Sequence, residues 1–328
     1  MVEAQSTHPA TPNAQAHLTA SNGHVTPRKR PSAESTWAQT GVGGNTWEPF
    51  LYLLPGFLVF TLFVAVPLVG TIALSLTDWD GFGDVRLSGF GNYVDAVQDP
   101  LFRDAAWHNI LLIPYFVVLP AILGLIPAVL IQGLRLRWEA LFRVGLFLPY
   151  IMPGILIGVV WRWLLNPAFG PVNAALERLG LPEPPWLGSF TLALPTVGLI
   201  GAWAAYGFCY VVFLAGIQKI PLDLYEAARL DGAGPVQEFR AVTLPGLRRE
   251  IAVVVSVNII NALRAFDVIQ ATTRGGPGRE TNVVALYMIE NAFSINRVGY
   301  GATLAVLLTV ATLILSLLAL RLAGGLDD

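Results

Sequence analysis

Residues 51–76 read LYLLPGFLVFTLFVAVPLVGTIALSL, a stretch that contains no Asp, Glu, Lys or Arg. A helix of about 20 apolar residues is long enough to cross the roughly 30 Å of hydrocarbon in a bilayer. A surface helix of a soluble protein instead keeps polar residues on the face that meets water. This stretch therefore predicts a membrane-spanning helix.

Five further apolar segments follow the first at intervals typical of a multi-pass membrane protein. Hydrophobic residues make up 54% of the chain, charged residues 13%, and the mean hydropathy is +0.59. Soluble domains contain about 25% charged residues, so most of this surface does not face water. We predict an all-α integral membrane protein with about six transmembrane helices, at 50–77, 107–133, 143–165, 191–217, 250–271 and 299–324.

The first 45 residues differ in composition from the rest of the chain. They are rich in Ser, Thr, Ala and Pro and poor in large apolar groups, which predicts a disordered tail at 1–45 before a transmembrane domain at 46–328. Arg and Lys are more frequent in this tail and in the connections after the second and fourth segments than in the other connections. The positive-inside rule then predicts that both termini are cytoplasmic.

Composition also excludes several kinds of chemistry. The net charge of −2 offers no basic surface for nucleic acid. Cys209 is the single cysteine, and every histidine except His108 lies in the tail, so a Cys/His metal cluster is excluded. An ATP-binding P-loop needs Gly-Lys-Ser/Thr, and neither Lys29 nor Lys219 stands in that motif. We expect no catalytic residue, no metal and no cofactor in this chain.

The connection at 218–249 contains the most specific pattern. It reads IPLDLYEAARLDGAGP at 220–235 and VTLP at 242–245. Pro221 before an acidic first turn starts a helix, and DGAG at 231–234 ends it before a second proline starts another. The pattern predicts a helix–turn–helix that either docks in the groove of a partner or rests on lipid headgroups.

These residues resemble the EAA loop of bacterial ABC importer permeases, whose pattern is E-A-A-x3-G-x9-I-x-L-P. Glu226-Ala227-Ala228, Gly232 and Leu244-Pro245 stand at the family's spacing, and Val242 replaces the isoleucine. The fuller string EAARLDGAG is similar to the carbohydrate branch, which includes the membrane subunits of the maltose importer. Shorter stretches agree over about 50–320, among them SLTDW at 75–79, GPVN at 170–173 and TRGGP at 273–277.

The resemblance implies a permease with six core spans and a coupling loop that docks in a cleft of a separate ATPase. It implies as partners a second permease subunit, two ATP-binding subunits that hold ATP and Mg²⁺, and an extracellular solute-binding protein, in a bacterial cell membrane. Glu226 would pair with a basic group of the ATPase, and Gly232 would supply a sharp turn. The residues that it implicates in coupling are Glu226, Ala227, Ala228, Asp231, Gly232, Ala233, Leu244 and Pro245.

Polar side chains recur every three residues in the fifth segment. Charges within a span are costly and usually face a partner or a water-filled cavity. Because the row slants around the helix, any three successive members can face one cavity. They either form a sugar-passing surface or join helices, with an Arg264–Asp267 pair. Aromatic residues of the fourth segment allow the same two interpretations. The candidate pathway residues are Asn258, Asn261, Arg264, Asp267, Trp203, Tyr206 and Tyr210.

An ion-gradient-driven secondary transporter is the alternative to the importer. It would need a titratable residue near the middle of the membrane and, typically, inverted repeats. Only Arg264 and Asp267 could serve, and the sequence shows no repeat. An ATPase subunit that stays bound in detergent would favour the importer, whereas flux that depends on an ion gradient would favour the alternative. No motif specifies which sugar is carried.

Overall fold

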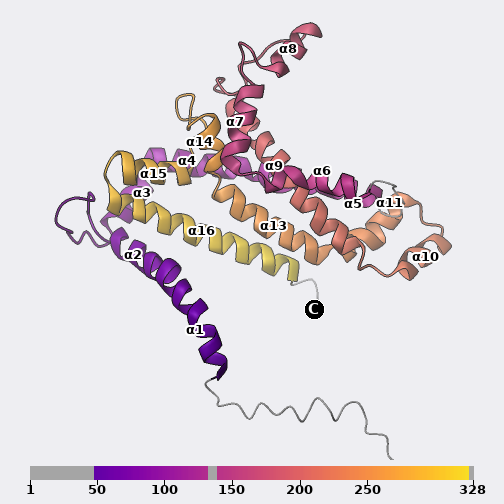
Figure 1. The fold of residues 1–328 in the computed structure, drawn as a ribbon, viewed down its shortest axis with the longest axis horizontal. Coiled ribbons are helices and arrows are strands. Elements are labelled where there is room, and N and C mark those ends of the chain that lie inside the picture. Colours follow the sequence, from indigo (N-terminus) through magenta and orange to yellow (C-terminus); the bar gives the residue numbers. More distant parts are fainter. Residues whose placement is uncertain (1–47, 132–138, 325–328) are drawn as a thin grey trace, which may run out of the picture. The chain divides into compact units, whose positions relative to one another are not determined.

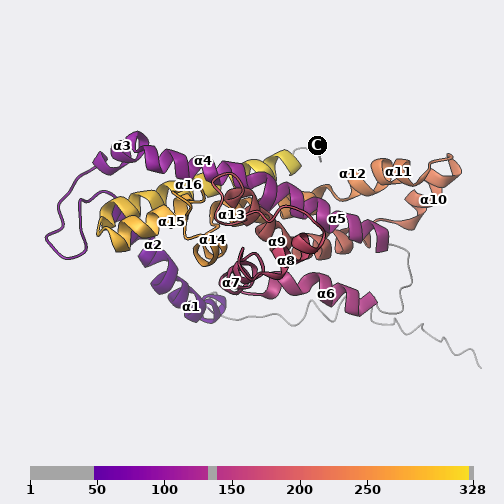
Figure 2. The same ribbon diagram turned by 90° about the horizontal axis from the view of Figure 1, so that it is seen from above.

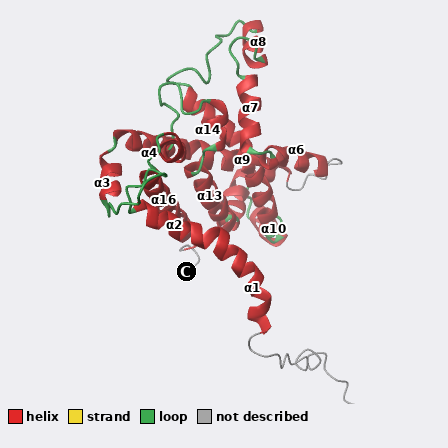
Figure 3. Ribbon diagram, turned by 60° about the vertical axis from the view of Figure 1, so that its left-hand side comes forward, coloured by secondary structure: helices red, strands yellow, loops and turns green. Residues whose placement is uncertain are grey.

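The computed structural model describes residues 48–131 and 139–324. Within these ranges the regular elements are helices, and one isolated β-bridge joins Thr77 to Leu87 (Figure 3). The chain divides into two compact units, Met1–Val59 and Phe60–Asp328. The tail predicted at 1–45 lies outside the described residues.

Four helices of the described part are long and apolar enough to cross a membrane: Phe50–Ser75, Pro100–Ile131, Ala193–Ile217 and Val298–Arg321. A bent pair of helices in the third predicted segment would make a fifth span. The remaining predicted span, 250–271, contains two shorter helices, the longer of 16 residues. The fold class predicted from the sequence is confirmed, whereas the number of six spans stays a prediction.

The first two spans are each built from helices joined by a π-helical turn. The first contains α1 (Glu48–Phe60), η2 (Thr61–Ala65) and α2 (Val66–Ser75), and the second contains α4 (Pro100–Ile113), η3 (Pro114–Val118) and α5 (Leu119–Ile131). The second span begins before the predicted residue 107, because the Asp99 carboxylate caps α4 by accepting from Leu101 N at 2.9 Å. Pro114 opens η3, where the wider turn accommodates a residue without an N–H.

The third predicted segment, 143–165, is bent. The segment forms α6 (Glu139–Ile151) and α7 (Gly154–Leu164), which meet at 96°. Pro153 has an extended backbone and precedes the first residue of α7, and a proline also disfavours helical geometry in the residue before it. Pro149, which the sequence also shows in this segment, lies inside α6.

The fifth predicted segment, 250–271, is interrupted. Here α13 (Arg248–Leu263) ends three residues before α14 (Asp267–Thr272) begins, with no Pro or Gly at the break. Carbonyls freed at a break inside a membrane need another donor. Asn109 of α4 supplies it, because its Nδ2 donates to Ala262 O at 3.0 Å and to Leu263 O at 3.3 Å.

Helix α9 (Ala193–Ile217) is the most buried of the four long helices. It packs against α5, α6 and α13. Glycines allow two of these approaches: a Cβ on Gly124 of α5 would come within 2.6 Å of Cys209 Cβ, and a Cβ on Gly207 would collide with the backbone of Leu146 in α6. The apolar core therefore lies around α9, and the candidate sites described below adjoin it.

The short elements gather at two ends of the bundle. α3 (Gly91–Gln98), α15 (Val284–Ile289) and η5 (Glu290–Ser294) lie at the end where α16 (Val298–Gly324) begins. α10 (Leu222–Leu230), α11 (Pro235–Glu238), η4 (Phe239–Thr243) and α12 (Leu244–Gly246) lie at the opposite end, as two views show (Figures 1 and 2). α8 (Pro171–Arg178) follows α7 and belongs to neither group.

Candidate functional site

The connection between α9 and α13 forms two short helical arms joined by a tight turn. α10 is the first arm, and α11 with η4 forms the second. Gly232, in the turn, has a φ of +82°, a left-handed conformation that side chains disfavour. Gln237 Oε1 accepts from Gly234 N at 2.8 Å and so holds the start of the second arm. We call residues 221–246 the coupling hairpin.

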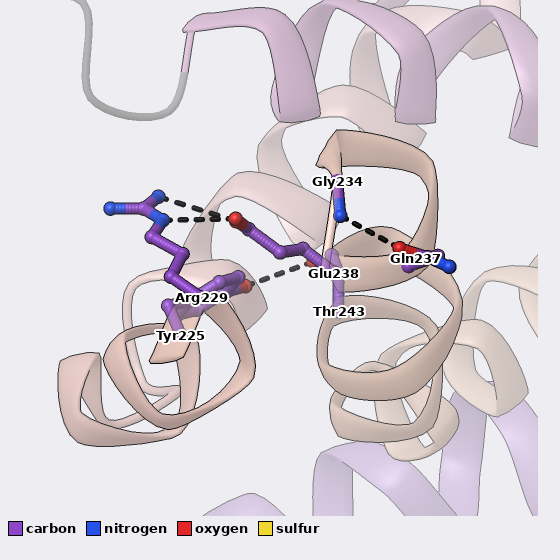
Figure 4. A network of polar contacts seen from close by, with 6 residues as sticks. All are labelled: Tyr225, Arg229, Gly234, Gln237, Glu238 and Thr243. Atoms are coloured by element: carbon purple, nitrogen blue, oxygen red, sulfur yellow. Dashed lines mark hydrogen bonds and ion pairs between the residues drawn. The ribbon is translucent and has the colours of Figure 1, made fainter. Parts of the chain in front are cut away.

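Two side-chain contacts hold the arms of the coupling hairpin together (Figure 4). Tyr225 and Thr243, both buried, join their hydroxyls at 3.0 Å. Arg229 donates to Glu238 twice, from Nε to Oε1 at 2.9 Å and from NH2 to Oε2 at 3.2 Å. Hydrogen bonds from the guanidinium to Glu238 and the charge of that carboxylate raise the pKa of Arg229 above its usual range. The arms are therefore joined as one unit.

Cavities adjoin the hairpin on two sides. One of about 620 Å³ is lined by Leu222, Tyr225, Glu226, Arg229 and Glu238, among others. Another of about 570 Å³ is lined by residues that include Pro221, Leu224, Val242 and Pro245. Several large apolar side chains project from the hairpin into open space, each more than half exposed: Leu222, Leu224, Leu230 and Val236. An unpaired surface of this kind is typical of a site that receives a partner.

The residues that the sequence implicates in coupling are spread over this hairpin. Glu226, Ala227, Asp231, Gly232 and Leu244 are exposed, and the structure places the others, Ala228, Ala233 and Pro245, in half-buried positions. Glu226 and Pro245 line different cavities. The motif therefore does not form one contiguous patch. It supplies a turn, an exposed carboxylate and the junction with α13.

A second candidate site lies between the two broken segments. A cavity of about 210 Å³ is lined by Pro149, Tyr150, Met152 and Gly154 at the α6–α7 bend and by Asn261, Arg264, Ala265, Phe266 and Asp267 at the α13–α14 break. Discontinuous helices are where membrane transporters build substrate sites, because the chain there exposes polar groups. We call this space the break cavity.

Only part of the predicted row of polar residues reaches the break cavity. Asn261, Arg264 and Asp267 line it, and no ion pair joins Arg264 to Asp267 within the described residues. Asn258 is instead buried and donates from Nδ2 to Cys209 Sγ at 3.2 Å. The helix axis changes direction after Leu263, so Asp267 belongs to the start of α14 and lies against Gly154 of α7.

The aromatic candidates of α9 lie outside the break cavity. Trp203 packs edge-on against Trp161, with ring centroids 5.4 Å apart, and Tyr210 is fully buried in the core. Tyr206 is half-buried and does not belong to the cavity lining. Sequence reasoning missed Tyr150, which lines the cavity and stacks on Phe208 at 5.2 Å. Its nearby prolines were the available signal, because they mark the bend.

The comparison with known proteins assigns the chain to a family. Residues 49–327 match the binding-protein-dependent transport system inner membrane components. The chain belongs to this family. It is 33% identical over 284 residues to the diacetylchitobiose uptake system permease protein NgcF of Streptomyces coelicolor, covering 81% of this chain and 80% of that protein. It is 33% identical over 288 residues to the sulfoquinovosyl glycerol transport system permease protein SmoG of Agrobacterium fabrum, covering 87% and 92%.

A solved structure shares the fold of this permease. The bacterial alginate ABC transporter, in complex with an alginate pentasaccharide-bound periplasmic protein, matches with a TM-score of 0.72 and 23% identity. The match covers 83% of this chain and 92% of that chain. This permease is accordingly a multi-pass component of the inner membrane.

Proposed function

We propose that this chain is the membrane-spanning permease subunit of an ABC importer that moves a carbohydrate or sugar derivative into a bacterial cytoplasm by alternating access. The observation that carries the proposal is the family match over residues 49–327, together with relatives named for sugar uptake. A second permease subunit and two ATP-binding subunits complete the importer. ATP and Mg²⁺ bind to the two ATP-binding subunits, and this chain does no catalysis.

The break cavity suits the passage of a sugar. Its charged and amide groups, Arg264, Asp267 and Asn261, can donate to and accept from hydroxyls, and the rings of Tyr150 and Phe266 offer flat apolar faces. Within the described residues Arg264 and Asp267 form no ion pair with each other, so both side chains can bind a solute. The other candidate pathway residues, Asn258, Trp203, Tyr206 and Tyr210, lie outside the cavity lining and serve the packing around this path.

The candidates for direct contact with the sugar are then the three polar residues of the cavity, Asn261, Arg264 and Asp267.

The coupling hairpin suits a partner on the cytoplasmic side. It lies at the end of the bundle opposite α3 and α15, which places those helices outside if both termini are cytoplasmic (Figures 1 and 2). Its exposed leucines offer apolar surface, and the exposed Glu226 carboxylate offers a charge for a basic group of the ATP-binding subunit. Movement of that subunit on binding ATP would then pass through the hairpin to α13.

The outer end suits an extracellular solute-binding protein. A polar cavity of about 420 Å³ opens there, lined by Gln270, Arg274, Gly275, Gly276 and Arg279, among others. Arg274 has a left-handed backbone with φ of +51°, a conformation that is uncommon outside glycine and often found at functional sites. The alginate importer of similar fold is described in complex with a periplasmic protein, which supports a partner of this class.

ATP-driven uptake in proteoliposomes tests the proposal. The chain would be purified from its native host with the subunits that stay bound in detergent, reconstituted, and supplied with ATP, the solute-binding protein and radiolabelled diacetylchitobiose or a maltose-type sugar. We expect uptake that needs ATP on the side of the membrane that carries the ATP-binding subunits. This uptake should not respond to a sodium or proton gradient. Uptake driven by an ion gradient without ATP would favour the secondary transporter instead.

A substitution in the break cavity makes the same test specific. Arg264→Gln keeps a hydrogen-bonding side chain of similar length but removes the charge, and we expect a KM increase of about tenfold with the ATPase still bound. Arg162→Gln, in α7 and outside the cavity lining, is the matched control and should transport as the unaltered chain does. An unchanged KM in Arg264→Gln would contradict the role of the cavity.

A further inference from the structure

Arg229 lies within reach of two carboxylates, and only one of them holds it. On α10, Glu226 and Arg229 are three residues apart, a spacing at which a glutamate and a following cation pair on a helix surface. The structure instead joins Arg229 to Glu238 of the second arm by two parallel bonds of 2.9 and 3.2 Å. The guanidinium therefore reaches across to Glu238 of α11 (Figure 4).

The geometry explains why Arg229 pairs with Glu238 and not with Glu226. The Glu238 side chain is only 15% exposed, whereas that of Arg229 is 64% exposed, so the carboxylate is the more enclosed partner of the pair. A guanidinium that meets both oxygens of one carboxylate makes the strongest type of side-chain ion pair. Glu238 is also the main cause of the raised pKa of Arg229, and Glu226 is the smallest of the named causes.

The Glu226 carboxylate is left without a hydrogen-bond or ion-pair partner among the described residues. Its side chain lines the same cavity as Arg229 and Glu238, and no hydrogen bond or ion pair of Glu226 is present among the described residues. With Arg229 bonded to Glu238, the exposed Glu226 carboxylate interacts with that guanidinium only electrostatically, without a hydrogen bond or ion pair within the described residues.

We propose that Glu238 is a positioning residue that holds Arg229 away from Glu226, so that the Glu226 carboxylate stays free for a cationic group of the ATP-binding subunit. This inference rests on the proposed coupling function of Glu226. It adds that Arg229 of the coupling hairpin could itself pair with the Glu226 carboxylate. The bond between Arg229 and Glu238, which joins the two arms, prevents that pairing.

Single and double variants separate this role from a purely structural clamp. Glu238→Gln keeps the shape of the side chain but releases Arg229, which can then pair with Glu226. The double variant Arg229→Gln/Glu238→Gln lacks the clamp as well, but it also lacks the competing cation. If Glu238 has a positioning role, the double variant should recover the binding of the ATP-binding subunit that Glu238→Gln loses. If Glu238 is only a clamp, both variants should lose that binding to the same extent.

The measurement is the amount of ATP-binding subunit that stays with the tagged chain. Complexes would be purified in detergent from membranes of the native host, and the bound subunit would be quantified by photolabelling with azido-ATP. Glu226→Gln should lower the labelling at least about tenfold, because it removes one partner of an interfacial charge pair. Glu238→Gln should lower it about threefold, in line with competition from an exposed helical pair. The double variant should return to the labelling of the unaltered chain.

Glu250→Gln is the matched control. Glu250 is 14% exposed and binds Lys219 Nζ at 3.2 Å, so its burial and chemistry resemble those of Glu238. Lys219 lies on the other cavity and is not on α10, so its release frees no competitor for Glu226. This variant should keep full labelling, and a loss as large as in Glu238→Gln would overturn the inference.

Two failures remain distinguishable. If Glu226→Gln keeps full labelling, the proposed coupling role of Glu226 is wrong. If Glu226→Gln loses the subunit but Glu238→Gln does not, or if the double variant stays as low as Glu238→Gln, the coupling role stands and the positioning role is overturned. Tyr225 and Thr243 still join the arms in every variant, and an unchanged thermal midpoint in detergent would show that the hairpin persists.

Discussion

Gly232 is a residue whose conformation, not its surroundings, forbids a side chain. Its φ is +82°, and a Cβ built there would meet nothing within 4 Å. Gly232→Val should therefore strain the turn by about 1–2 kcal/mol without any collision. We expect the variant to insert and to accumulate normally, and to lose ATP-dependent uptake in proteoliposomes because the two arms no longer meet at the same angle.

Gly232→Asn is the control for that prediction, because asparagine adopts left-handed backbone more readily than valine does. It should keep most of the uptake. Normal uptake in Gly232→Val would show that the turn geometry plays no part in coupling. Equal loss in both variants would show instead that any side chain at this position blocks a partner.

The residue scale also shows what local pattern can predict. A turn at Gly232 is expected from a run of small and polar residues, and the backbone there is left-handed, with a φ of +82°. The polar row of the fifth segment is predicted less well, since the spacing argument assumes a continuous helix. Asn258 faces Cys209 inside the core, and Asp267 reaches the break cavity only because α14 begins there.

Breaks in two helices are the feature of this fold that sequence periodicity does not reveal. The α6–α7 bend has a local cause in Pro153, although prolines in a span are equally compatible with plain packing. The α13–α14 break has no such cause. Its carbonyls are satisfied by Asn109, a residue 153 positions earlier in the chain. A contact that distant cannot be predicted from a window of a single helix.

Asn109 gives a direct test of that explanation. It is 2% exposed, donates to Ala262 O and Leu263 O, and accepts from Val284 N at 3.0 Å. Asn109→Leu fills a similar volume but removes this partner from Leu263 O and Val284 N, at a cost of about 1–3 kcal/mol for each, whereas Ala262 O keeps its bond from Ala265 N. We expect the thermal midpoint in detergent to fall by at least about 5 °C. A midpoint equal to that of the unaltered chain would show that the break is stable without Asn109.

At the scale of the whole molecule, composition and run length predict most of the answer. A chain with 54% hydrophobic and 13% charged residues has few alternatives to a helical membrane fold, and the structure and family match confirm that class. What composition leaves open is assembly. The described residues expose a large apolar surface on the first span, whose apolar 18-residue window contains no buried residue. Lipid and partner subunits are both compatible with that surface.

The orientation of the molecule is the remaining question at this scale, and cysteine labelling answers it. Leu230 on the coupling hairpin and Phe82 in the loop after the first span are 89% and 87% exposed. Cys209, the single native cysteine, is fully buried, so the unaltered chain provides a background of little labelling. We expect a membrane-impermeant maleimide to label Phe82→Cys in right-side-out vesicles. Leu230→Cys should react only after the vesicles are permeabilised.

The chain would be expressed without its partners, because an ATP-binding subunit docked on the hairpin would shield Leu230→Cys and imitate the expected result. The expected pattern follows from the excess of Arg and Lys in the tail and in the connections after the second and fourth segments. The reverse pattern would place the coupling hairpin outside the cell, where no ATP-binding subunit could reach it. Labelling of both variants in sealed vesicles would put the two loops on one side, which an even number of spans between them would require.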